Sequence, residues 1–486
     1  MLIFINQRRF KFIFLLVYIF IIVLSGCKEK TVEMSITKKI TAFLDTTMLQ
    51  IDHGQEEFRE EYKRLTGIEL EIIQPPHQQY MEKLLIQLSS GNLPDICEVS
   101  TSNLTQLVND GVVIALDKFI EKSRYIKSIY PKFLEAVKYK DGHTYGLQSR
   151  AGGGCITYIR KDWLNNLGLS IPESWDEFVE VLRAFTISDP DGNGRNDTFG
   201  YTEPLGTDGT DWDWYNRAIM LDARIDIYFK DGRWVDGFQE PAIIRALRRY
   251  KYLYAEGLID RELFTNKTST ARLKLCCGQV GVFTYWANHW ARNLWEQARK
   301  SAGNYTEVVP IPPIEGQFYV RRIAPLLVIT VGCENPGFVF TNFIDRQYDK
   351  GEIQTLFTYG VEGFHWKKNS DGTTIFLPNP KDEEKNLFRK SYVPPMAVQN
   401  DWEQPMQIDP LVLPALDIFN RHAKQDPLRA GGEYYGKYYM EITNSLKPEV
   451  FTRIILGEYT IEQGIALYKE RAEKLHIDDI LSELNN

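Results

Sequence analysis

The sequence predicts an α/β protein of two lobes, each a mainly parallel sheet flanked by helices, joined by crossover hinge segments. Two observations carry this prediction. The chain has 486 residues, which is more than one ordinary domain holds. Strand-like and helix-like stretches alternate at the spacing of βαβ units, from about residue 35 and again from Cys155. A hydrophobic content of 43% and a charged content of 25% fit folded globular domains.

The first run of elements follows from periodicity and from end signals. Strands alternate apolar and polar residues, helices repeat apolar residues every three or four positions, and Gly67 is a typical residue just after a helix. The expected elements are strands at 35–44 and 68–73, helices at 57–65, 78–88, 103–110 and 116–120, and a short strand after Pro94.

The pattern restarts at Cys155, after a glycine-rich passage that we expect to be the first crossing between the lobes. Ser174 and Glu177 have the spacing of a capping box, as do Thr460 and Gln463 near the C-terminus. The expected elements are strands at 155–159 and 280–284 and helices at 161–167, 175–185, 241–256, 286–299, 335–348 and 448–456.

Two further crossings complete the domain assignment. Three prolines within 308–313 disfavour a helix and a central strand, so this stretch is interpreted as the second crossing. The third is expected near 357–363. The first lobe would then comprise 35–148 and 312–357, and the second lobe 149–308 and 362–486.

The N-terminus has the features of a secretion signal. Arg8, Arg9 and Lys11 precede the uncharged run 12–24, which is shorter than the roughly 20 apolar residues of a spanning helix. An uncleaved anchor is the alternative. The ending Leu-Ser-Gly-Cys resembles a bacterial lipobox, in which Cys27 is lipidated, residues 1–26 are removed and residues 27–34 form a polar tether.

Net charge and cysteine number exclude some classes of protein. Loss of residues 1–26 removes three cations and no acid, which takes the formal net charge from −8 to −11. An acidic body argues against nucleic acid as a partner. Five cysteines remain beyond Cys27, an odd number without metal-like spacing, so we expect buried thiols and not a disulfide framework.

An acidic loop at 189–197 is the most specific local signal for a metal. Asp189, Asp191 and Asn193 stand at positions 1, 3 and 5 of an EF-hand-like loop, and Gly194 stands at position 6. The carbonyl of Arg195 and the carboxylate of Asp197 would complete the ligands. Hard oxygen ligands turning at a glycine suit calcium in a structural role. A metal-free Asp/Asn/Gly turn is the alternative.

Five motifs in order resemble the extracellular solute-binding proteins of family 1, in particular the long lipoproteins that serve oligosaccharide ABC importers. They are LSGC, SSGNLPDI at 89–96, YIRKDWLNNLGL at 158–169, PESWDEF and DPDGNGRNDTFG. The resemblance implies a two-lobed periplasmic-binding-protein-like fold that closes on a sugar, with ABC permease subunits as partners and a monomer anchored at the outer face of the cell membrane. It also implies a shortened calcium loop that ends at positions 9 and 10, where this chain has Asp197 and Thr198.

Aromatic clusters are the candidates for ligand contact. A sugar presents an apolar face of C–H groups that packs on an aromatic plane, while its hydroxyls need polar partners. Core packing is the alternative for each ring. The candidate ligand-binding residues are Trp286, Trp212, Trp214 and Trp290, with Arg150 and Glu98 at the edge of the cleft and weaker interest in Asp213 and Asn288.

No catalytic residue is expected, because the sequence holds neither a G-x-S-x-G elbow nor an H-E-x-x-H motif. The sequence therefore predicts a lipid-anchored receptor that delivers an oligosaccharide to an ABC permease. A binding protein for a peptide or another small polar solute is the alternative within that class. A secreted carbohydrate-active enzyme is the alternative of another class, since paired carboxylates cannot be identified from sequence alone.

Overall fold

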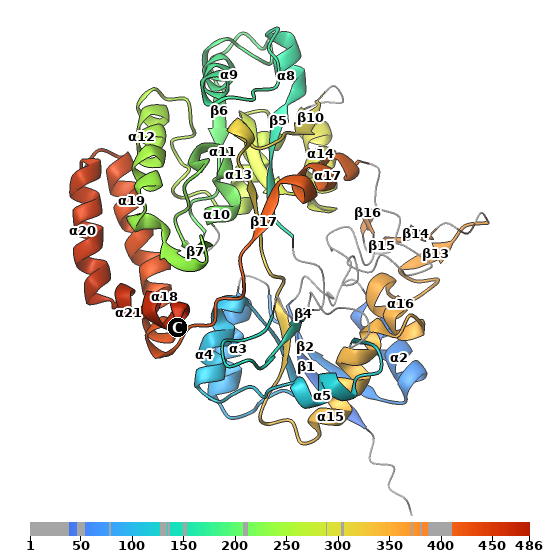
Figure 1. Ribbon diagram of the computed structural model, residues 1–486. Helices are drawn as coiled ribbons and strands as arrows, with labels where there is room; N and C mark the ends of the chain where they lie inside the picture. The colour runs from blue at the N-terminus through green and yellow to red at the C-terminus, as the bar shows by residue number, and fades with distance from the viewer. Residues whose placement is uncertain are drawn as a thin grey trace, which may run out of the picture. The chain divides into compact units, whose positions relative to one another are not determined.

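Two sheets organise the chain, and each has its own helices (Figure 1). One apolar core lies against the first sheet and two lie against the second. The chain from Lys39 to Asn486 is one compact unit. The computed structural model describes residues 38–45, 54–76, 79–126, 134, 137–148, 153–207, 212–287, 289–302, 306–370, 372, 374–379, 382–386 and 411–486. Cys27 and Arg150 lie outside these residues.

The first lobe is built on a sheet of five strands, in the order β2 (Glu69–Ile73), β1 (Lys39–Phe43), β3 (Ile96–Val99), β12 (Leu326–Ile329) and β4 (Leu147–Gln148). Its helices are α2 (Gln55–Thr66), α3 (Tyr80–Ser89), α4 (Thr101–Asn109), α5 (Asp117–Lys122), α15 (Pro336–Val339) and α16 (Glu352–Tyr359). Helices α3 and α4 lie on one side of the sheet, and α2 and α16 lie on the other (Figure 1).

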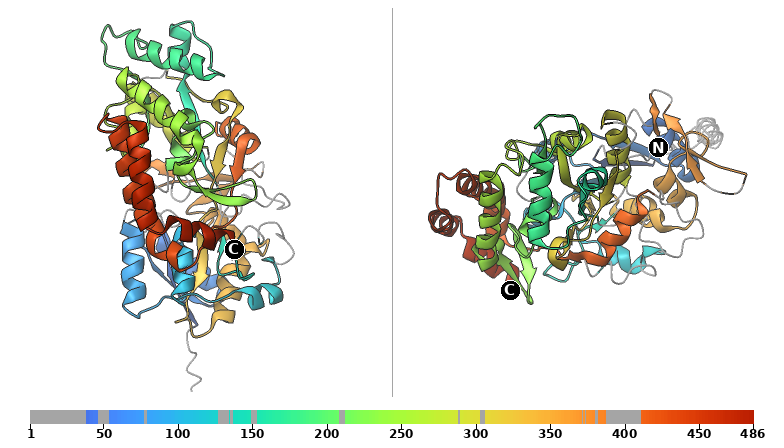
Figure 2. Two further views of the ribbon diagram at one scale, coloured as in Figure 1. Left: turned by 60° about the vertical axis from the view of Figure 1, so that its left-hand side comes forward. Right: turned by 90° about the horizontal axis from the view of Figure 1, so that it is seen from above.

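The second lobe is built on a sheet of four strands, in the order β10 (Val308–Pro310), β5 (Cys155–Arg160), β9 (Val280–Trp286) and β6 (Phe199–Thr202). Its helices are α8 (Lys161–Asn166), α9 (Trp175–Ile187), α10 (Trp212–Tyr215), α11 (Arg217–Met220), α12 (Pro241–Ala255), α13 (Thr268–Cys276), α14 (His289–Ala302), α17 (Leu413–His422), α18 (Glu433–Glu441), α19 (Lys447–Ile455), α20 (Ile461–Lys474) and α21 (Ile477–Asn485). Helices α12, α19 and α20 stand side by side (Figures 1 and 2).

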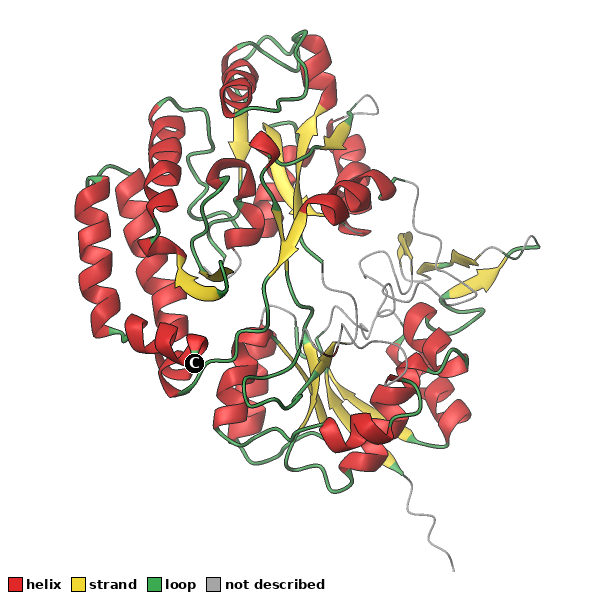
Figure 3. Ribbon diagram, in the orientation of Figure 1, coloured by secondary structure: helices red, strands yellow, loops and turns green. Residues whose placement is uncertain are grey.

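In the part of the chain that the structure describes, four small two-stranded ladders complete the strands (Figure 3). They are β7 (Ile227–Lys230) with β8 (Arg233–Asp236), β11 (Tyr319–Arg321) with β17 (Ala423–Gln425), β13 (Trp366–Lys368) with β14 (Thr374–Phe376), and β15 (Pro378–Asn379) with β16 (Asp382–Asn386). None of the helices among the described residues combines the length and the apolar character that a bilayer crossing needs.

The predicted two-lobed α/β class is confirmed, but the prediction of mainly parallel sheets is wrong, because both sheets are mixed. In the first sheet, β12 runs antiparallel to both of its neighbours, β3 and β4. In the second sheet, β5 runs antiparallel to β9 and β10, while β6 and β9 are parallel. The reversed strand is in each case the one through which the chain enters from the other lobe. Strands that are joined by a helical crossover within one lobe run parallel. The entering strand has no such crossover before it, and it runs antiparallel to the two strands between which it lies.

The second and third crossings lie later in the chain than predicted. Val308–Pro310 is an edge strand of the second sheet, a position that tolerates proline. Ile314 and Tyr319 still belong to second-lobe cores, and the first-lobe core resumes at Leu326. The crossing therefore follows Arg321. After α16 the ring of His365 still lies against Gly54 of the first lobe, so the third crossing lies beyond residue 363.

Local end signals in the sequence predicted several boundaries correctly. Gly67 ends α2 with a φ of 70°, and both predicted capping boxes form, at Ser174 and at Thr460. One boundary was wrong in a way that matters for the site. The helix expected from Trp286 begins at His289, and Trp286 is the last residue of β9. Of the five described cysteines, Cys277 is exposed and the other four are buried.

Candidate functional site

Two tryptophans from separate elements of the second lobe lie beside each other. Trp286 ends β9 and Trp214 lies in the single-turn helix α10, and their ring centroids are 6.5 Å apart at an interplanar angle of 49°. Both residues are half-buried. The Tyr158 hydroxyl donates to the Trp286 carbonyl at 2.9 Å and fixes the end of the strand. The structure thus pairs two of the four predicted tryptophans.

Arg322 joins this pair from the crossing segment after β11. Its guanidinium carbon lies 4.4 Å from the ring centroid of Trp286 and 5.2 Å from that of Trp214. Cation–π contacts of this kind contribute about 0.5–2 kcal/mol, depending on how far the cation is removed from water. Arg322 is not among the residues that the sequence predicted. The available signal, an Arg-Arg pair after Phe318-Tyr319, does not distinguish it from the other arginines.

The glycine-rich passage hydrogen-bonds to the backbone at Arg322 and at the residue after Trp286. The Gly153 carbonyl accepts the backbone N–H of Arg322 at 2.9 Å, and the Gly154 carbonyl accepts that of Ala287 at 3.1 Å, next to Trp286. A side chain at Gly154 would place its Cβ 2.4 Å from the Val320 carbonyl oxygen, so only glycine permits this approach. The first crossing therefore fixes the backbone at Arg322 and beside Trp286.

The chemistry of this cluster suits a ligand with apolar ring faces and acceptor oxygens. The two indoles offer flat apolar surface, and the guanidinium offers several N–H donors in a fixed plane. We call Trp214, Trp286 and Arg322 the aromatic–arginine cluster. It is a binding arrangement, and none of its three side chains can act as a nucleophile or as a general base at neutral pH.

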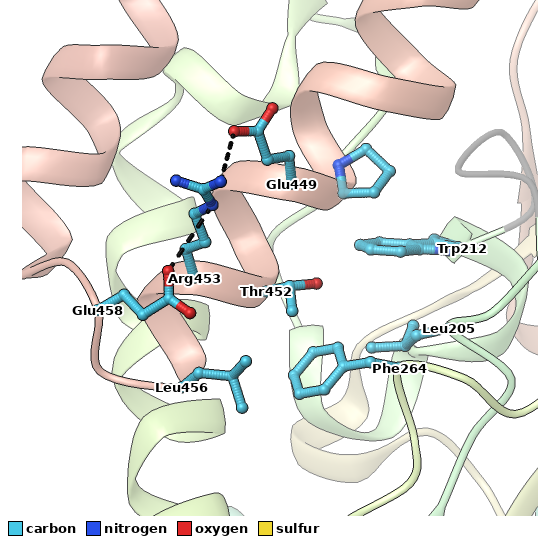
Figure 4. A pocket seen from close by; sticks show the side chains of 9 residues that line it. Leu205, Trp212, Phe264, Glu449, Thr452, Arg453, Leu456 and Glu458 are labelled. Carbon is cyan, nitrogen blue, oxygen red and sulfur yellow. Dashed lines mark ion pairs between the residues drawn. The ribbon is translucent and has the colours of Figure 1, made fainter.

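Trp212, which the sequence analysis placed at the ligand, lies instead in the second-lobe core. It is 1% exposed and packs edge-on against Phe451, with ring centroids 5.3 Å apart. Its side chain lines a separate pocket of about 370 Å³ together with Leu205 and Phe264 (Figure 4). Residues two apart on one helical turn point in different directions, so Trp214 and Trp212 cannot share one site.

The remaining predicted ligand contacts lie in different environments. Glu98 is 1% exposed on β3 of the first lobe, where its Oε2 accepts the backbone N–H of Asp45 at 3.3 Å. Asp213 is equally buried and forms an ion pair with Arg224 at 2.9 Å. This ion pair gives the Asp213 carboxylate a structural role within the second lobe. Arg150, Asn288 and the side chain of Trp290 lie outside the described residues.

The acidic loop is held by hydrogen bonds among its own side chains. Asp189 accepts the backbone N–H groups of Asn193 and Gly194 at 3.0 and 2.9 Å. The Asn193 amide donates to Asp191 at 2.9 Å and to Asp197 at 3.3 Å. Burial, the largest cause, and the nearby carboxylates of Asp189 and Asp197 raise the pKa of Asp191.

The oxygen donors of the loop are of the kind that calcium prefers, but its described carboxylates do not converge on one point. Among the described residues, no three His, Cys, Asp or Glu side chains converge on a point that could hold a metal. Carboxylate, amide and carbonyl oxygens at alternate positions are nevertheless the donors that calcium prefers. Thr198, at position 10, donates its hydroxyl to the Phe185 carbonyl at 2.7 Å and is buried, so this hydroxyl is used elsewhere.

A buried carboxyl lies beneath α10. Glu203 is 1% exposed and accepts from the Tyr201 hydroxyl at 3.0 Å, and that hydroxyl also lies 3.2 Å from the Tyr215 carbonyl at the end of α10. Burial raises the pKa of Glu203 to about 8. The carboxyl is therefore protonated at neutral pH in the folded protein.

This raised pKa predicts that the protein loses stability as the pH rises. The contribution of Glu203 is fully present below its ordinary pKa of 4.5 and is lost as the pH rises through about 8. Between about pH 5.5 and pH 7 the free energy of unfolding of the wild type should fall by about 2 kcal/mol because of Glu203. Glu203→Gln should lack this fall, so its stability relative to the wild type should rise by the same amount. Urea unfolding at both pH values measures this gain. A constant difference between the two proteins would mean that Glu203 is ionised in the fold.

The fold is a two-lobed α/β architecture, with two indoles and a guanidinium beside the first crossing. The family model for bacterial extracellular solute-binding proteins matches residues 53–336. The chain belongs to this family.

Curated relatives and solved structures agree with this assignment. Lipoprotein LipO of Bacillus subtilis is 27% identical over 67% of this chain and 66% of its own length. The polygalacturonan/rhamnogalacturonan-binding protein YtcQ of the same organism is 28% identical over 64% of each chain. The alignments thus span just under two thirds of these relatives. The structure of the alginate-binding protein AlgQ2 without calcium ion has a TM-score of 0.69 at 19% identity, covering 92% of this chain and 97% of that one.

One relative was also solved with a sugar. The fructooligosaccharide ABC transporter substrate-binding protein FusA of Streptococcus pneumoniae is 26% identical over 43% of this chain and 42% of its own length. Its structure in complex with kestose has a TM-score of 0.65 at 19% identity, covering 92% of this chain and 98% of that one. At this identity the structural likeness concerns the fold.

Proposed function

We propose that this protein is a lipid-anchored receptor that captures an oligosaccharide and delivers it to an ABC transporter permease. The observation that carries the proposal is the aromatic–arginine cluster, which lies at the junction of the first two crossings and joins two indole faces to a guanidinium. The family and the sugar-binding relatives supply the wider role. Cys27, which would carry the lipid, follows a lipobox-like stretch, and LipO is named a lipoprotein.

The proposed mechanism is closure of the two lobes on the ligand. A sugar that contacts both lobes binds the closed state better than the open state. It shifts the equilibrium toward the closed state by the difference between the two binding free energies. Trp214 and Trp286 would stack on the sugar, and Arg322 would donate to its oxygens. Glu98, Arg150 and Trp290 stay candidates for further contacts. The closed protein would then dock on the permease subunits as a monomer.

Incubation of the purified mature protein with mixtures of oligosaccharides tests this function. A receptor should show a raised melting temperature with one sugar class and should return that sugar chemically unchanged. Binding of this kind stabilises the fold because only the native state holds the ligand. Release of shorter products would instead identify a secreted carbohydrate-active enzyme. A response to peptides alone would identify a different solute.

We also propose that the acidic loop binds calcium in a structural role. Asp189, Asp191, Asn193 and Asp197 would supply side-chain oxygens, and Arg195 would supply its carbonyl. The structures of AlgQ2 without calcium ion and of an EF-hand mutant of FusA concern similar folds.

Chelation of calcium is expected to lower the melting temperature by a few degrees, because removal of a ligand at about 100 times its dissociation constant costs about 2.7 kcal/mol. Asp189→Asn should abolish this response. Asp231→Asn is the matched control, since both residues are aspartates with positive φ, 45° and 51°. The melting curve with and without chelator measures both variants. A wild-type curve that chelator does not move would show a metal-free turn.

A further inference from the structure

The end of α10 lies against a hydroxyl that has a second partner. The Tyr201 hydroxyl is 3.2 Å from the carbonyl oxygen of Tyr215, the last residue of α10, and 3.0 Å from Oε2 of Glu203. All three residues are buried. A hydroxyl has one proton, so it can donate to only one of these two oxygens at a time.

The protonation state of Glu203 decides which oxygen receives this proton. A neutral carboxyl can donate its own proton to the Tyr201 oxygen, which leaves the Tyr201 proton for the Tyr215 carbonyl. An ionised carboxylate has lost its proton to water and can only accept, so it takes the Tyr201 proton in a stronger, charge-assisted hydrogen bond. Ionisation of Glu203 therefore removes the hydrogen bond from Tyr201 to the end of α10.

Two hydroxyls are the titratable groups that face the Glu203 carboxyl. They belong to Tyr201 on β6 and to Tyr250 on α12. Burial raises the pKa of Glu203 to about 8, and the two hydroxyls lower it by less. The charge of Arg217, on α11, acts on the Tyr250 hydroxyl, while its guanidinium donates to the Ala223 carbonyl at 2.7 Å. Among the described residues no cation pairs with Glu203, and its Oε1 is buried without a hydrogen bond, so the neutral form predominates at neutral pH.

Trp214 lies between two anchored residues of α10. On one side, the Asp213 carboxylate accepts the backbone N–H of Ile225 at 2.8 Å. On the other side is Tyr215, whose carbonyl faces the shared hydroxyl. The Trp214 indole itself is half-buried beside Trp286. Because Trp214 directly precedes Tyr215, the orientation of its indole depends on the hydrogen bond at the end of the helix.

We propose that Glu203 is a positioning residue for the sugar. In its neutral form it leaves the Tyr201 hydroxyl to the Tyr215 carbonyl, and this hydrogen bond keeps Trp214 in the orientation that stacks on the ligand. Affinity then falls as the pH rises and Glu203 ionises. By linkage, the ligand favours the neutral form, so binding takes up a proton where the free protein has lost it. This inference rests on the proposed sugar-binding function and adds a proton as its regulator.

Titration calorimetry of the mature protein at about pH 6 and about pH 9 tests the proposal. The probes are kestose, which is neutral, and a short oligogalacturonide, whose carboxylates stay ionised at both pH values. The affinity of the wild type should be about three- to tenfold lower at the higher pH, the effect of one neutral hydrogen bond. Titrations near pH 8 in buffers of different ionisation enthalpy should show that binding takes up part of a proton.

Three variants separate positioning from a purely structural role. Glu203→Gln has an amide that donates to the Tyr201 oxygen at any pH, so its affinity should not depend on pH. Tyr201→Phe keeps the carboxyl but lacks the shared hydroxyl, so it should bind with the lower affinity at both pH values. Tyr250→Phe is the matched control. Its hydroxyl faces the same carboxyl and makes no hydrogen bond to α10, so this variant should still lose affinity as the pH rises.

A melting curve recorded with each titration shows that the protein is folded. Equal affinities of the wild type at the two pH values would overturn the inference and leave sugar binding intact, and so would a pH dependence that persists in Tyr201→Phe. Binding of neither probe at either pH would overturn it as well, and a different sugar found in the wider screen would then preserve the proposed function alone.

Discussion

Replacing Trp286 by alanine is expected to weaken oligosaccharide binding by about 100-fold, the loss typical of a central aromatic contact. The ring is half-buried, lies beside Trp214 and has the Arg322 guanidinium 4.4 Å from its centroid. Alanine removes the stacking surface and also the face against which Arg322 is held. Calorimetric titration with the sugar identified by the melting-temperature screen measures the loss.

Trp175 provides a matched control for this variant. It is also half-buried in the second lobe and also has a guanidinium over its ring, that of Arg249 at 5.5 Å, but it begins α9 and is not part of the cluster. Trp175→Ala should lower stability to a similar extent and change affinity by less than about twofold. If Trp286→Ala reduced the melting temperature but left affinity at the wild-type value, the ring would be a core residue and the site would lie elsewhere.

The choice among the tryptophans shows where sequence reasoning reaches its limit. The stretch Asp-Trp-Asp-Trp contains two rings that both fit the chemistry of a sugar site. On a single helical turn one of them must face the core, and which one does so depends on the direction in which α10 packs. That direction is set by distant contacts, such as that of Trp212 with Phe451. The local sequence pattern therefore identifies the segment that contributes to the site, but it does not distinguish Trp214 from Trp212.

A similar division holds for the fold. Capping boxes and the glycine after α2 act within a few residues, so their sequence patterns predicted helix ends that the structure confirms. The strand directions depend instead on where the chain enters each sheet. The antiparallel placement of β12 pairs Leu326 with Val99, residues more than two hundred positions apart. Arg322 was missed for the same reason, because only the crossing of two remote segments brings it to Trp286.

Lys447→Ala is expected to lower the free energy of unfolding by about 3–5 kcal/mol, because it leaves a buried carboxylate without its cation. The Lys447 ammonium lies 2.8 Å from Asp236 Oδ1, and both side chains are fully buried. The ammonium also donates to the Ile225 carbonyl at 2.8 Å, and the Tyr468 hydroxyl donates to Asp236 Oδ2 at 2.7 Å. The pair thus joins α19 to the β7–β8 ladder and to α20.

Chemical unfolding in urea measures this loss, and two further variants identify its cause. Lys474→Ala breaks a pair with Glu470 in which both side chains are about two thirds exposed, and it should cost at most about 0.5 kcal/mol. Adding Asp236→Asn to Lys447→Met should recover part of the loss, since the second change removes the unpaired buried charge. A cost below about 1 kcal/mol for Lys447→Ala would mean that water reaches Asp236 once the lysine is gone. The buried pair would then not be what fixes α19 against the ladder.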